Sequence, residues 1–527
     1  MTVLAEAKPR VTSHTVRPEA VEGLPAGWLT VLLSDVIQQV STTDPARKPE
    51  VEITYFDISS IHNESGVVVD PKVVRGVDAP SRARQLVEVG DVLFSTVRPN
   101  LRAIAQVPRA VNGVASTGFC VLRAADSVVA KYLFYFVRSE GFLDVVLPLE
   151  RGVSYPAVRS VDVVSQSIPL APAAEQTRIV EKLEELLSDL DAGVAELKAA
   201  QKKLTQYRQS LLKAAVEGVL TADWRKHNHP AESGAQLLER ILKERRARWQ
   251  AKQLAKFKEQ GKAPPKDWQD KYPEPKKPDT TDLPPLPEGW VWASIDQMAQ
   301  VGTGVTPLRS KPAYFENGSI AWVTSGALNA ETVTTATEYV SELALKECRL
   351  ELYPVGALLV AMYGEGKTRG KCSELLIPAT INQAIAALVL ESQAAACKAY
   401  LKTFLLHSYE AMRGQASGGV QPNLNLQIIK TIALPLPPVV EQQEIASQIE
   451  QQFEQLERQK DAVKHALKQS TAQRKNILKA AFSGQLVPQD PNDEPASVLL
   501  ARIRAERAGL ASKPRVGRRK VALADVI

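Results

Sequence analysis

Cysteine and long apolar runs are scarce in this chain of 527 residues, and each shortage excludes a class of protein. The four cysteines are Cys120, Cys348, Cys372 and Cys397. They lie far apart and form no CxxC pair, so the sequence indicates a reducing cytoplasm rather than disulfides or a zinc site. No run approaches the ~20 apolar residues of a membrane span, and the first residues, MTVLAEAKPR, lack the apolar core of a signal peptide. We expect a soluble cytoplasmic protein with no membrane partner.

Motifs of catalysis are also lacking. None of the six histidines stands at the spacing of a metal site or a catalytic triad, and the Asp/Asn-Pro-Pro-Tyr/Phe motif of amino-methyltransferases does not occur. GEGKT (364–368) resembles the end of a phosphate-binding loop, but Ala361 occupies the place of the first glycine. Gly370 and Pro378 argue against the helix that must follow such a loop. We therefore predict no catalytic residue, no metal and no cofactor in this chain; a P-loop-like ATP-dependent enzyme built on GEGKT is the alternative.

One long pattern of apolar residues occurs twice. After Pro172, apolar side chains recur in steps of three and four residues: Ile179, Leu183, Leu186, Leu190, Leu197, Leu204, Tyr207 and Leu211. Such a heptad pattern predicts a helix with a partner helix along its length. A shift of 266 residues finds the segment again, with Pro438 at its start and Gly484 in place of Gly218 at its end. We predict two helices about 65 Å long that pair antiparallel within the chain; a dimerisation coiled coil is the alternative.

A compact segment precedes each long helix. Each opens with one motif, LPAGW (24–28) or LPEGW (286–290), and closes with a loop, GVSYPAV (152–158) or GGVQPNL (418–424). Short apolar runs broken by Gly, Pro and Asp, such as GDVLFSTV (90–97), predict strands. Each segment also has a helical stretch, so both are predicted to be α/β or α+β domains of one design.

The predicted organisation has seven parts. They are an N-terminal arm (1–23), a first domain (24–171), a first long helix (172–220), a basic helical spacer with a Pro-rich linker (221–285), a second domain (286–437), a second long helix (438–486), and a C-terminal helix with a basic tail (487–527). Two similar domains with different side chains, held on a fixed spacer, suit a target with two unlike parts. A net charge of +6 permits a polyanionic partner without requiring one.

These repeated features resemble the DNA specificity subunit of type I restriction-modification enzymes over nearly the whole chain. The paired LPxGW openings, the paired loops, the IPLxP and LPLPP helix starts with their Glu-Gln pairs, and the LLKAAVEG and ILKAAFSG helix ends carry the resemblance. It implies two target recognition domains, each reading half of a bipartite sequence in double-stranded DNA, and a coiled-coil spacer that docks two modification methyltransferase subunits. S-adenosylmethionine would then belong to those adenine-methylating partners, and ATP with Mg to separate restriction and motor subunits. A duplicated coiled-coil scaffold that touches only protein is a further alternative.

Candidate DNA contacts lie at the strand ends and in the two closing loops. In the first domain they are Arg82, Arg84, Arg98, Asn100, Arg102, Ser154 and Tyr155; in the second they are Lys367, Arg369, Lys371, Asn382, Gln421 and Asn423. Arginine can pair with guanine, and asparagine or glutamine with adenine, whereas lysine more often touches phosphate. A solvated basic loop is the alternative for the charged residues. For Tyr155, Asn382 and Asn423 we favour a role in shaping the loop.

Overall fold

The computed structural model describes residues 23–108, 112–364, 368–415 and 423–512. The chain divides into two compact units: the first consists of Met1–Lys198 with Lys464–Ile527, and the second of Ala199–Val463. Two of the predicted candidates, Lys367 and Gln421, lie outside the described residues. No helix in the described part of the chain is both long enough and apolar enough to cross a membrane.

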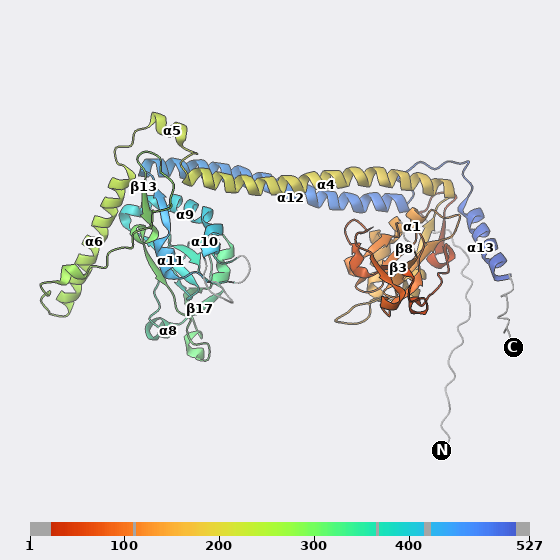
Figure 1. Cartoon of the computed structure of the whole chain (residues 1–527), viewed down its shortest axis with the longest axis horizontal. Helices are drawn as coiled ribbons and strands as arrows, with labels where there is room; N and C mark the ends of the chain where they lie inside the picture. The colour runs from red at the N-terminus through yellow and green to blue at the C-terminus, as the bar shows by residue number, and fades with distance from the viewer. Residues whose placement is uncertain (1–22, 109–111, 365–367, 416–422, 513–527) are drawn as a thin grey trace, which may run out of the picture. The chain divides into compact units, whose positions relative to one another are not determined.

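The first unit contains two four-stranded sheets (Figure 1). One has the order β6 (Lys72–Arg75), β3 (Glu52–Phe56), β10 (Gly113–Ser116) and β7 (Ala83–Leu86). The other has the order β2 (Ile37–Gln38), β11 (Phe119–Ala124), β8 (Val92–Ser95) and β9 (Ile104–Gln106). Two short antiparallel pairs add β1 (Leu29–Leu32) with β12 (Ser167–Leu170), and β4 (Ile61–His62) with β5 (Val67–Val68).

Helices cover the apolar face of the second of these sheets. They are α1 (Ala130–Val137), α2 (Glu140–Val146) and α3 (Ser160–Val164). Their buried side chains form one core with strand residues such as Phe94 and Leu122 and with residues of the long helices. Phe94 and Phe142 meet edge to face with ring centroids 5.8 Å apart.

The second unit repeats this plan with a larger mixed sheet. Its five strands have the order β14 (Ala299–Thr303), β21 (Ile385–Leu390), β18 (Leu358–Ala361), β19 (Cys372–Leu375) and β16 (Thr332–Val333). A three-stranded sheet has the order β17 (Glu338–Val340), β15 (Ile320–Val323) and β20 (Thr380–Ile381), and β13 (Val291–Ser294) pairs with β22 (Ala433–Leu436). The helices are α5 (Ala222–His227), α6 (Gly234–Glu259), α7 (Ile295–Met298), α8 (Glu342–Glu347), α9 (Lys398–His407), α10 (Tyr409–Gln415) and α11 (Leu426–Thr431).

Two helices of 44 residues, α4 (Ala173–Val216) and α12 (Val439–Phe482), contribute to both units. Within the second unit Arg208 of α4 pairs with Glu457 of α12 at 3.3 Å. Within the first unit Arg474 of α12 pairs with Asp191 of α4. A shift of 266 residues converts one ion pair into the other, with donor and acceptor helices exchanged. The pairing is therefore antiparallel in each unit, and the predicted internal repeat is confirmed.

The repeated glycines end the long helices for two physical reasons. Gly218 and Gly484 have φ of +72° and +71°, in the left-handed region that side chains disfavour. A Cβ on Gly218 would lie 2.7 Å from the ring of Pro287, and one on Gly484 would lie 2.1 Å from the ring of Pro25. Each helix thus ends against an LPxGW motif of its own unit.

The tryptophan of each LPxGW motif fastens its domain to a long helix. The indole of Trp28 donates to Glu175 at 2.9 Å, and that of Trp290 donates to Glu441 at the same distance; both bonds are buried. The next residue, Gln176, donates to the carbonyl of Ala171, and the corresponding Gln442 donates to that of Pro437. The two repeated motifs, LPxGW and Glu-Gln, are therefore the two halves of one joint.

Two further helices dock on the units in the same way. Arg245 of α6 donates to the carbonyls of Asp296 and Ala299 in the second unit. Arg507 of α13 (Ala496–Ser512) donates to the carbonyls of Ser34 and Ile37 in the first. The first unit is thus completed by a helix from the end of the chain, and the second by a helix from its middle.

Candidate nucleic-acid interface

The closing loop of the first unit lies against the end of strand β8. Arg151 and Ala157 exchange two backbone hydrogen bonds of 2.9 Å, and Gly152 adopts φ +95° in the turn between them. The amide of Val158 donates to the carbonyl of Thr96 at 2.9 Å, and that of Arg98 donates to the carbonyl of Pro156 at 2.7 Å. These bonds bring the loop 152–158 beside the residues that follow β8.

Arg98 and Tyr155 form the centre of this surface. The guanidinium carbon of Arg98 lies 4.9 Å from the centroid of the Tyr155 ring, and its Nη2 donates to the carbonyl of Ser154 at 3.3 Å. Both side chains are exposed, Tyr155 to 71%. The ring fixes the plane of the guanidinium while leaving donor groups open, which is the geometry that bidentate recognition of guanine or phosphate needs.

The backbone around Arg98 adopts an uncommon conformation. Arg98 and Arg102 have φ of +48° and +57°, on either side of the short turn Pro99–Leu101. Left-handed backbone at residues other than glycine costs energy and tends to gather at functional sites. The exposed side chain of Asn100 lies at the tip of this turn.

Arg82 borders the same surface. Its carbonyl accepts from the amide of Thr117 at 2.9 Å, while the adjacent Gly118 carbonyl accepts from the amide and hydroxyl of Thr96, each at 2.9 Å. The Arg82 side chain is exposed. The structure therefore brings together five of the first domain's candidates: Arg82, Arg98, Asn100, Ser154 and Tyr155.

Two other candidates of the first domain are engaged within the protein. Arg84 forms an ion pair with Asp44 and lowers the pKa of that carboxyl. Arg102 binds both oxygens of Glu140, at 2.7 and 2.8 Å, and lowers the pKa of Glu140. Any contact that these arginines make with DNA must compete with a carboxylate already in place.

A pair of arginines at the base of the loop was not among the predicted candidates. Arg151 and Arg159 both bind Asp162, at 2.6 and 2.9 Å, and Asp162 also accepts from the amide of Arg159 at 2.9 Å. The guanidinium of Arg159, then that of Arg151, holds the pKa of Asp162 well below its usual range. Both arginines remain exposed, so the cluster keeps one net positive charge beside the loop. The signal in the sequence was the arginine on each side of GVSYPAV.

The second unit reproduces the contact between loop and strand end. The amide of Leu424 donates to the carbonyl of Met362 at 3.2 Å, which is the bond from Val158 to Thr96 shifted by 266 residues. The site is thus conserved in backbone geometry between the halves. Its side chains differ, because Met362 and Leu424 replace Thr96 and Val158.

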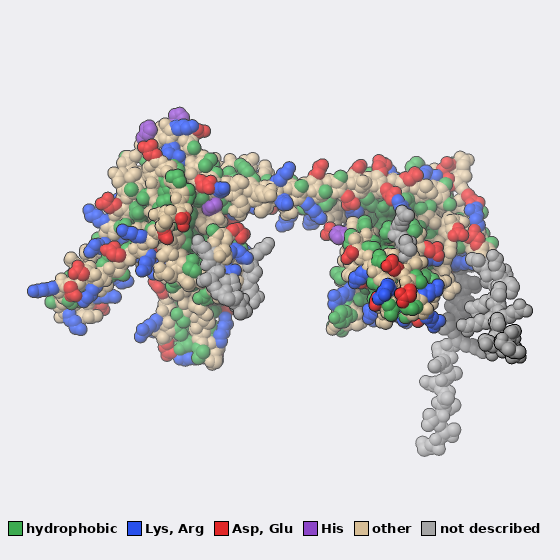
Figure 2. Space-filling view, in the orientation of Figure 1, with side chains coloured by type: hydrophobic (Ala, Val, Ile, Leu, Met, Phe, Trp, Pro, Cys, Tyr) green, Lys and Arg blue, Asp and Glu red, His purple; other side chains and the backbone are tan. Residues whose placement is uncertain are grey.

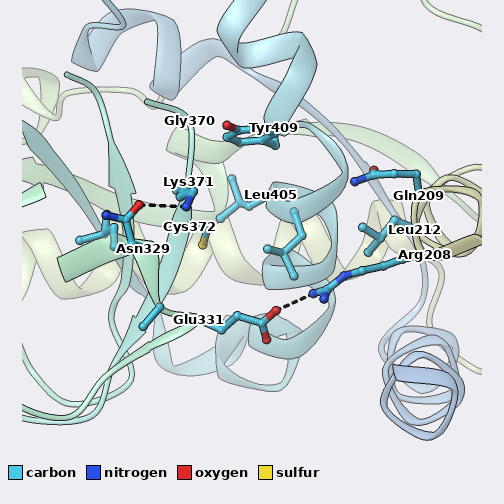
Figure 3. A pocket seen from close by; sticks show the side chains of 13 residues that line it. Arg208, Gln209, Leu212, Asn329, Glu331, Gly370, Lys371, Cys372, Leu405 and Tyr409 are labelled. Atoms are coloured by element: carbon cyan, nitrogen blue, oxygen red, sulfur yellow. Dashed lines mark hydrogen bonds and ion pairs between the residues drawn. The ribbon is translucent and has the colours of Figure 1, made fainter. Parts of the chain in front are cut away.

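Among the second domain's described candidates, Lys371 lies at the edge of a cavity of about 240 Å³. Its ammonium donates to the amide oxygen of Asn329 at 2.9 Å, as Figure 3 shows. Across the cavity Glu331 pairs with Arg208 of α4 at 2.5 Å. A neutral partner leaves the positive charge of Lys371 uncompensated, so the residue can still attract an anion.

The remaining candidates of the second domain have different surroundings. Asn382 accepts from the amide of Ala384 at 3.1 Å through its side chain and donates its own amide to the carbonyl of Val323 at 3.0 Å, so it shapes the turn before β21. Asn423 and Arg369 are partly buried beside the loop and the strand end.

The described residues after GEGKT do not form a nucleotide-binding unit. The chain passes through a turn at 369–370 into β19, which pairs antiparallel with β18. A phosphate-binding loop requires a helix in this place. No group of three or more His, Cys, Asp or Glu side chains among the described residues could hold a metal ion.

Comparisons with known proteins agree on one family. Residues 287–465 match the family model described as type I restriction modification DNA specificity domain. The type I restriction enzyme EcoDI specificity subunit of Escherichia coli is 26% identical over 409 residues, which cover 73% of this chain and 78% of that protein. The EcoKI specificity subunit of E. coli K12 is 32% identical over 108 residues, or 20% of this chain and 23% of that protein.

Solved structures extend the likeness to most of the chain. A chain in the structure reported as "Structural basis underlying complex assembly and conformational transition of the type I R-M system" has a TM-score of 0.67 and 25% identity, over 88% of this chain and 99% of that one. The HsdS subunit from Thermoanaerobacter tengcongensis shares the fold, with a TM-score of 0.51 and 24% identity over 88% and 98% of the two chains.

Proposed function

Because the chain belongs to the family of type I restriction-modification DNA specificity subunits, we propose that its two units each read one half of a bipartite target in double-stranded DNA. The observation that carries the proposal is the repeated loop and strand end, with one backbone arrangement and two sets of side chains. One arrangement gives both units the same approach to DNA, and different side chains give them different preferred bases. The chain itself is non-catalytic.

In the first unit, Arg98 supports the proposal most directly. A planar guanidinium fixed by an exposed ring can donate to the two acceptors of guanine in the major groove, and the nearby Asn100 can pair with adenine. Arg82, Arg151 and Arg159 are placed to contact the backbone phosphates on either side. In the second unit we propose Arg369, Lys371 and Asn423, together with Lys367 and Gln421, as the corresponding set.

We assign the recognition domains to residues 24–171 and 286–437 and the spacer to residues 172–220 and 438–486. The spacer would set the length of the unread gap and dock two modification methyltransferase subunits. Support for two copies comes from two cavities at equivalent places. In the second unit the cavity is lined by Gln209 and Leu212 of α4, and in the first a cavity of about 880 Å³ is lined by Lys475 and Leu478 of α12.

We assign the chemistry to other subunits in the cytoplasm. Methyltransferase subunits would bring S-adenosylmethionine and methylate adenine, and restriction and motor subunits would bring ATP with Mg. The recognition residues of this chain would decide which adenines the methyltransferase reaches.

A domain exchange tests the proposal. Residues 28–164 are replaced by the same region of a relative with a known target, and methylated adenines are mapped in cells that also carry the methyltransferase subunit. We expect one half of the target to change, while the other half and the gap stay constant. Exchange of residues 290–430 is the matched control and should change only the other half. A change of both halves by either exchange would overturn the proposal.

A further inference from the structure

Most of the positive charge of the protein is concentrated in one short segment. Residues 243–277 contain twelve Lys and Arg and five Asp and Glu, a net charge of +7, while the entire chain carries +6. The rest of the chain is therefore close to neutral. We call this segment, the distal part of α6 with the residues that follow it, the basic arm; Figure 2 shows its Lys and Arg side chains around α6.

The basic arm is not needed to dock α6. Docking uses the first half of the helix, where Leu237 and Ile241 are buried and Arg245 binds the carbonyls at the start of the second domain. The equivalent α13 docks on the first unit through Leu499 and Arg507 in the same manner. Beyond this shared part, α6 extends away from the sheets of the second unit (Figure 1).

Aromatic contacts give the arm a fixed structure of its own. Trp268, in the segment that returns along the helix, stacks on Trp249 with ring centroids 5.9 Å apart and meets Phe257 at 6.1 Å. Tyr272 packs on Trp249 at 5.4 Å and lies under the guanidinium of Arg246. A helix that is polar on all sides needs such support. An extended linker between two domains would not need it.

The end of the helix presents lysines that the protein itself does not neutralise. The side chains of Lys252, Lys256, Lys258 and Lys262 are exposed, and none forms an ion pair or hydrogen bond with another described residue. Lysine is a flexible point charge, which suits contact with phosphates and carries little base preference.

We infer that the basic arm binds the phosphate backbone of duplex DNA next to the half-site of the second unit, without reading sequence. The inference rests on the proposed function, because α6 is docked on the unit that would read that half-site. Eleven residues of helix, from Trp249 to Glu259, span about 15 Å. That length corresponds to about four base pairs, so the arm can reach two to four phosphates on one strand.

The test uses the complex of the full chain with its methyltransferase partner. Lys252, Lys256, Lys258 and Lys262 are changed to Gln together, and the matched control changes the same four to Arg. Dissociation constants are measured between 50 and 200 mM salt for a duplex with the target and for one without it. Each lost phosphate contact lowers the slope of log K against log salt by about 0.9, so we expect the Gln variant to lose about 2 to 4 from the slope on both duplexes. The Arg control should keep the slope, and both variants should methylate the same sequence.

The outcomes separate this inference from the function on which it rests. An unchanged slope in the Gln variant, with the wild-type complex still preferring its target, would overturn the arm's role alone. Weaker assembly with the methyltransferase at an unchanged DNA slope would show that the arm docks protein, and would also overturn it. Equal binding of both duplexes by the wild-type complex would instead overturn the proposed function. Trimming the flanking DNA beside the second half-site should remove the difference between the variant and the wild type.

Discussion

The two joints between tryptophan and glutamate offer a matched comparison within one chain. Trp28→Phe and Trp290→Phe each remove an indole donor from a carboxylate that is 1% exposed. The loss of ring surface is the same in both, so it cancels when the two are compared. What differs is the set of donors that remains on each carboxylate.

Glu441 keeps strong partners after its tryptophan is removed. Arg225 donates to it twice, at 2.8 and 3.0 Å, and the hydroxyl of Thr221 donates at 2.8 Å. Glu175 keeps only the amide of Gln489, at 3.2 Å, among the side-chain donors in the described residues. A hydrogen bond to a charged group contributes about 1.5–3 kcal/mol, and an unsatisfied buried carboxylate adds to the loss. We expect W28F to lower the free energy of unfolding of the first unit by about 3 kcal/mol, and W290F to lower that of the second by about 2 kcal/mol.

The order should reverse when the acid is changed. Glu441→Gln leaves the partly buried Arg225 without its charge partner, whereas Glu175→Gln leaves no cation in that position. We expect E441Q to cost about 2–3 kcal/mol and E175Q about 1 kcal/mol. Amide hydrogen exchange measured separately in β1 with β12 and in β13 with β22 reports each unit in the intact chain. A W290F effect as large as that of W28F, or an E175Q effect as large as that of E441Q, would refute this account of the joints.

Two further predictions concern the first unit's loop. Arg98→Ala should cost about 1–3 kcal/mol of binding to the target and relax base preference in one half-site, whereas Arg159→Gln should weaken binding to all sequences alike and lower the salt slope by about 1; binding to a panel of single-base variants across salt distinguishes the two, and a uniform loss from R98A would contradict base reading. Because Arg159 and Arg151 depress the pKa of Asp162 from 3.8, the carboxylate stabilises the loop fully above about pH 4 and loses this effect only as the pH falls through the lower, folded-state value. Exchange of residues 151–158, corrected for the intrinsic rate, should therefore stay constant from pH 7 to about pH 5 and be faster in Asp162→Asn throughout; a loop that loosens between pH 7 and pH 5 would contradict the assignment.

Local signals made the long helices predictable. Pro172 and Gly218 mark the ends of α4 because a fixed φ and a left-handed φ act on the chain where they stand. The partner helix was also predictable, because the repeat placed a second copy of the pattern in the same chain. The basic stretch of α6 was recognised as helical, but its aromatic brace was not, because Trp249 and Trp268 meet only after the chain turns back.

The recognition surface was less accessible to sequence reasoning. Arg98 and Tyr155 were named as candidates from their places in a strand end and a loop, and folding brings them together across more than fifty residues. Arg84 and Arg102 looked equivalent to Arg98 in the sequence. Their acidic partners, Asp44 and Glu140, stand about forty residues away and emerge only in the folded chain.

The docking of α13 on the first unit has a consequence for the order in which the protein can fold during synthesis. Residues 199–463 of the second unit are contiguous, so that unit can be completed as soon as they leave the ribosome. The first unit begins earlier but must wait for Leu499, Leu500 and Ile503 to cover the apolar side chains of Leu33 and Val36. The domain made first is therefore finished last, and until the final helix arrives its uncovered core is the part of the newborn chain most open to chaperones and proteases.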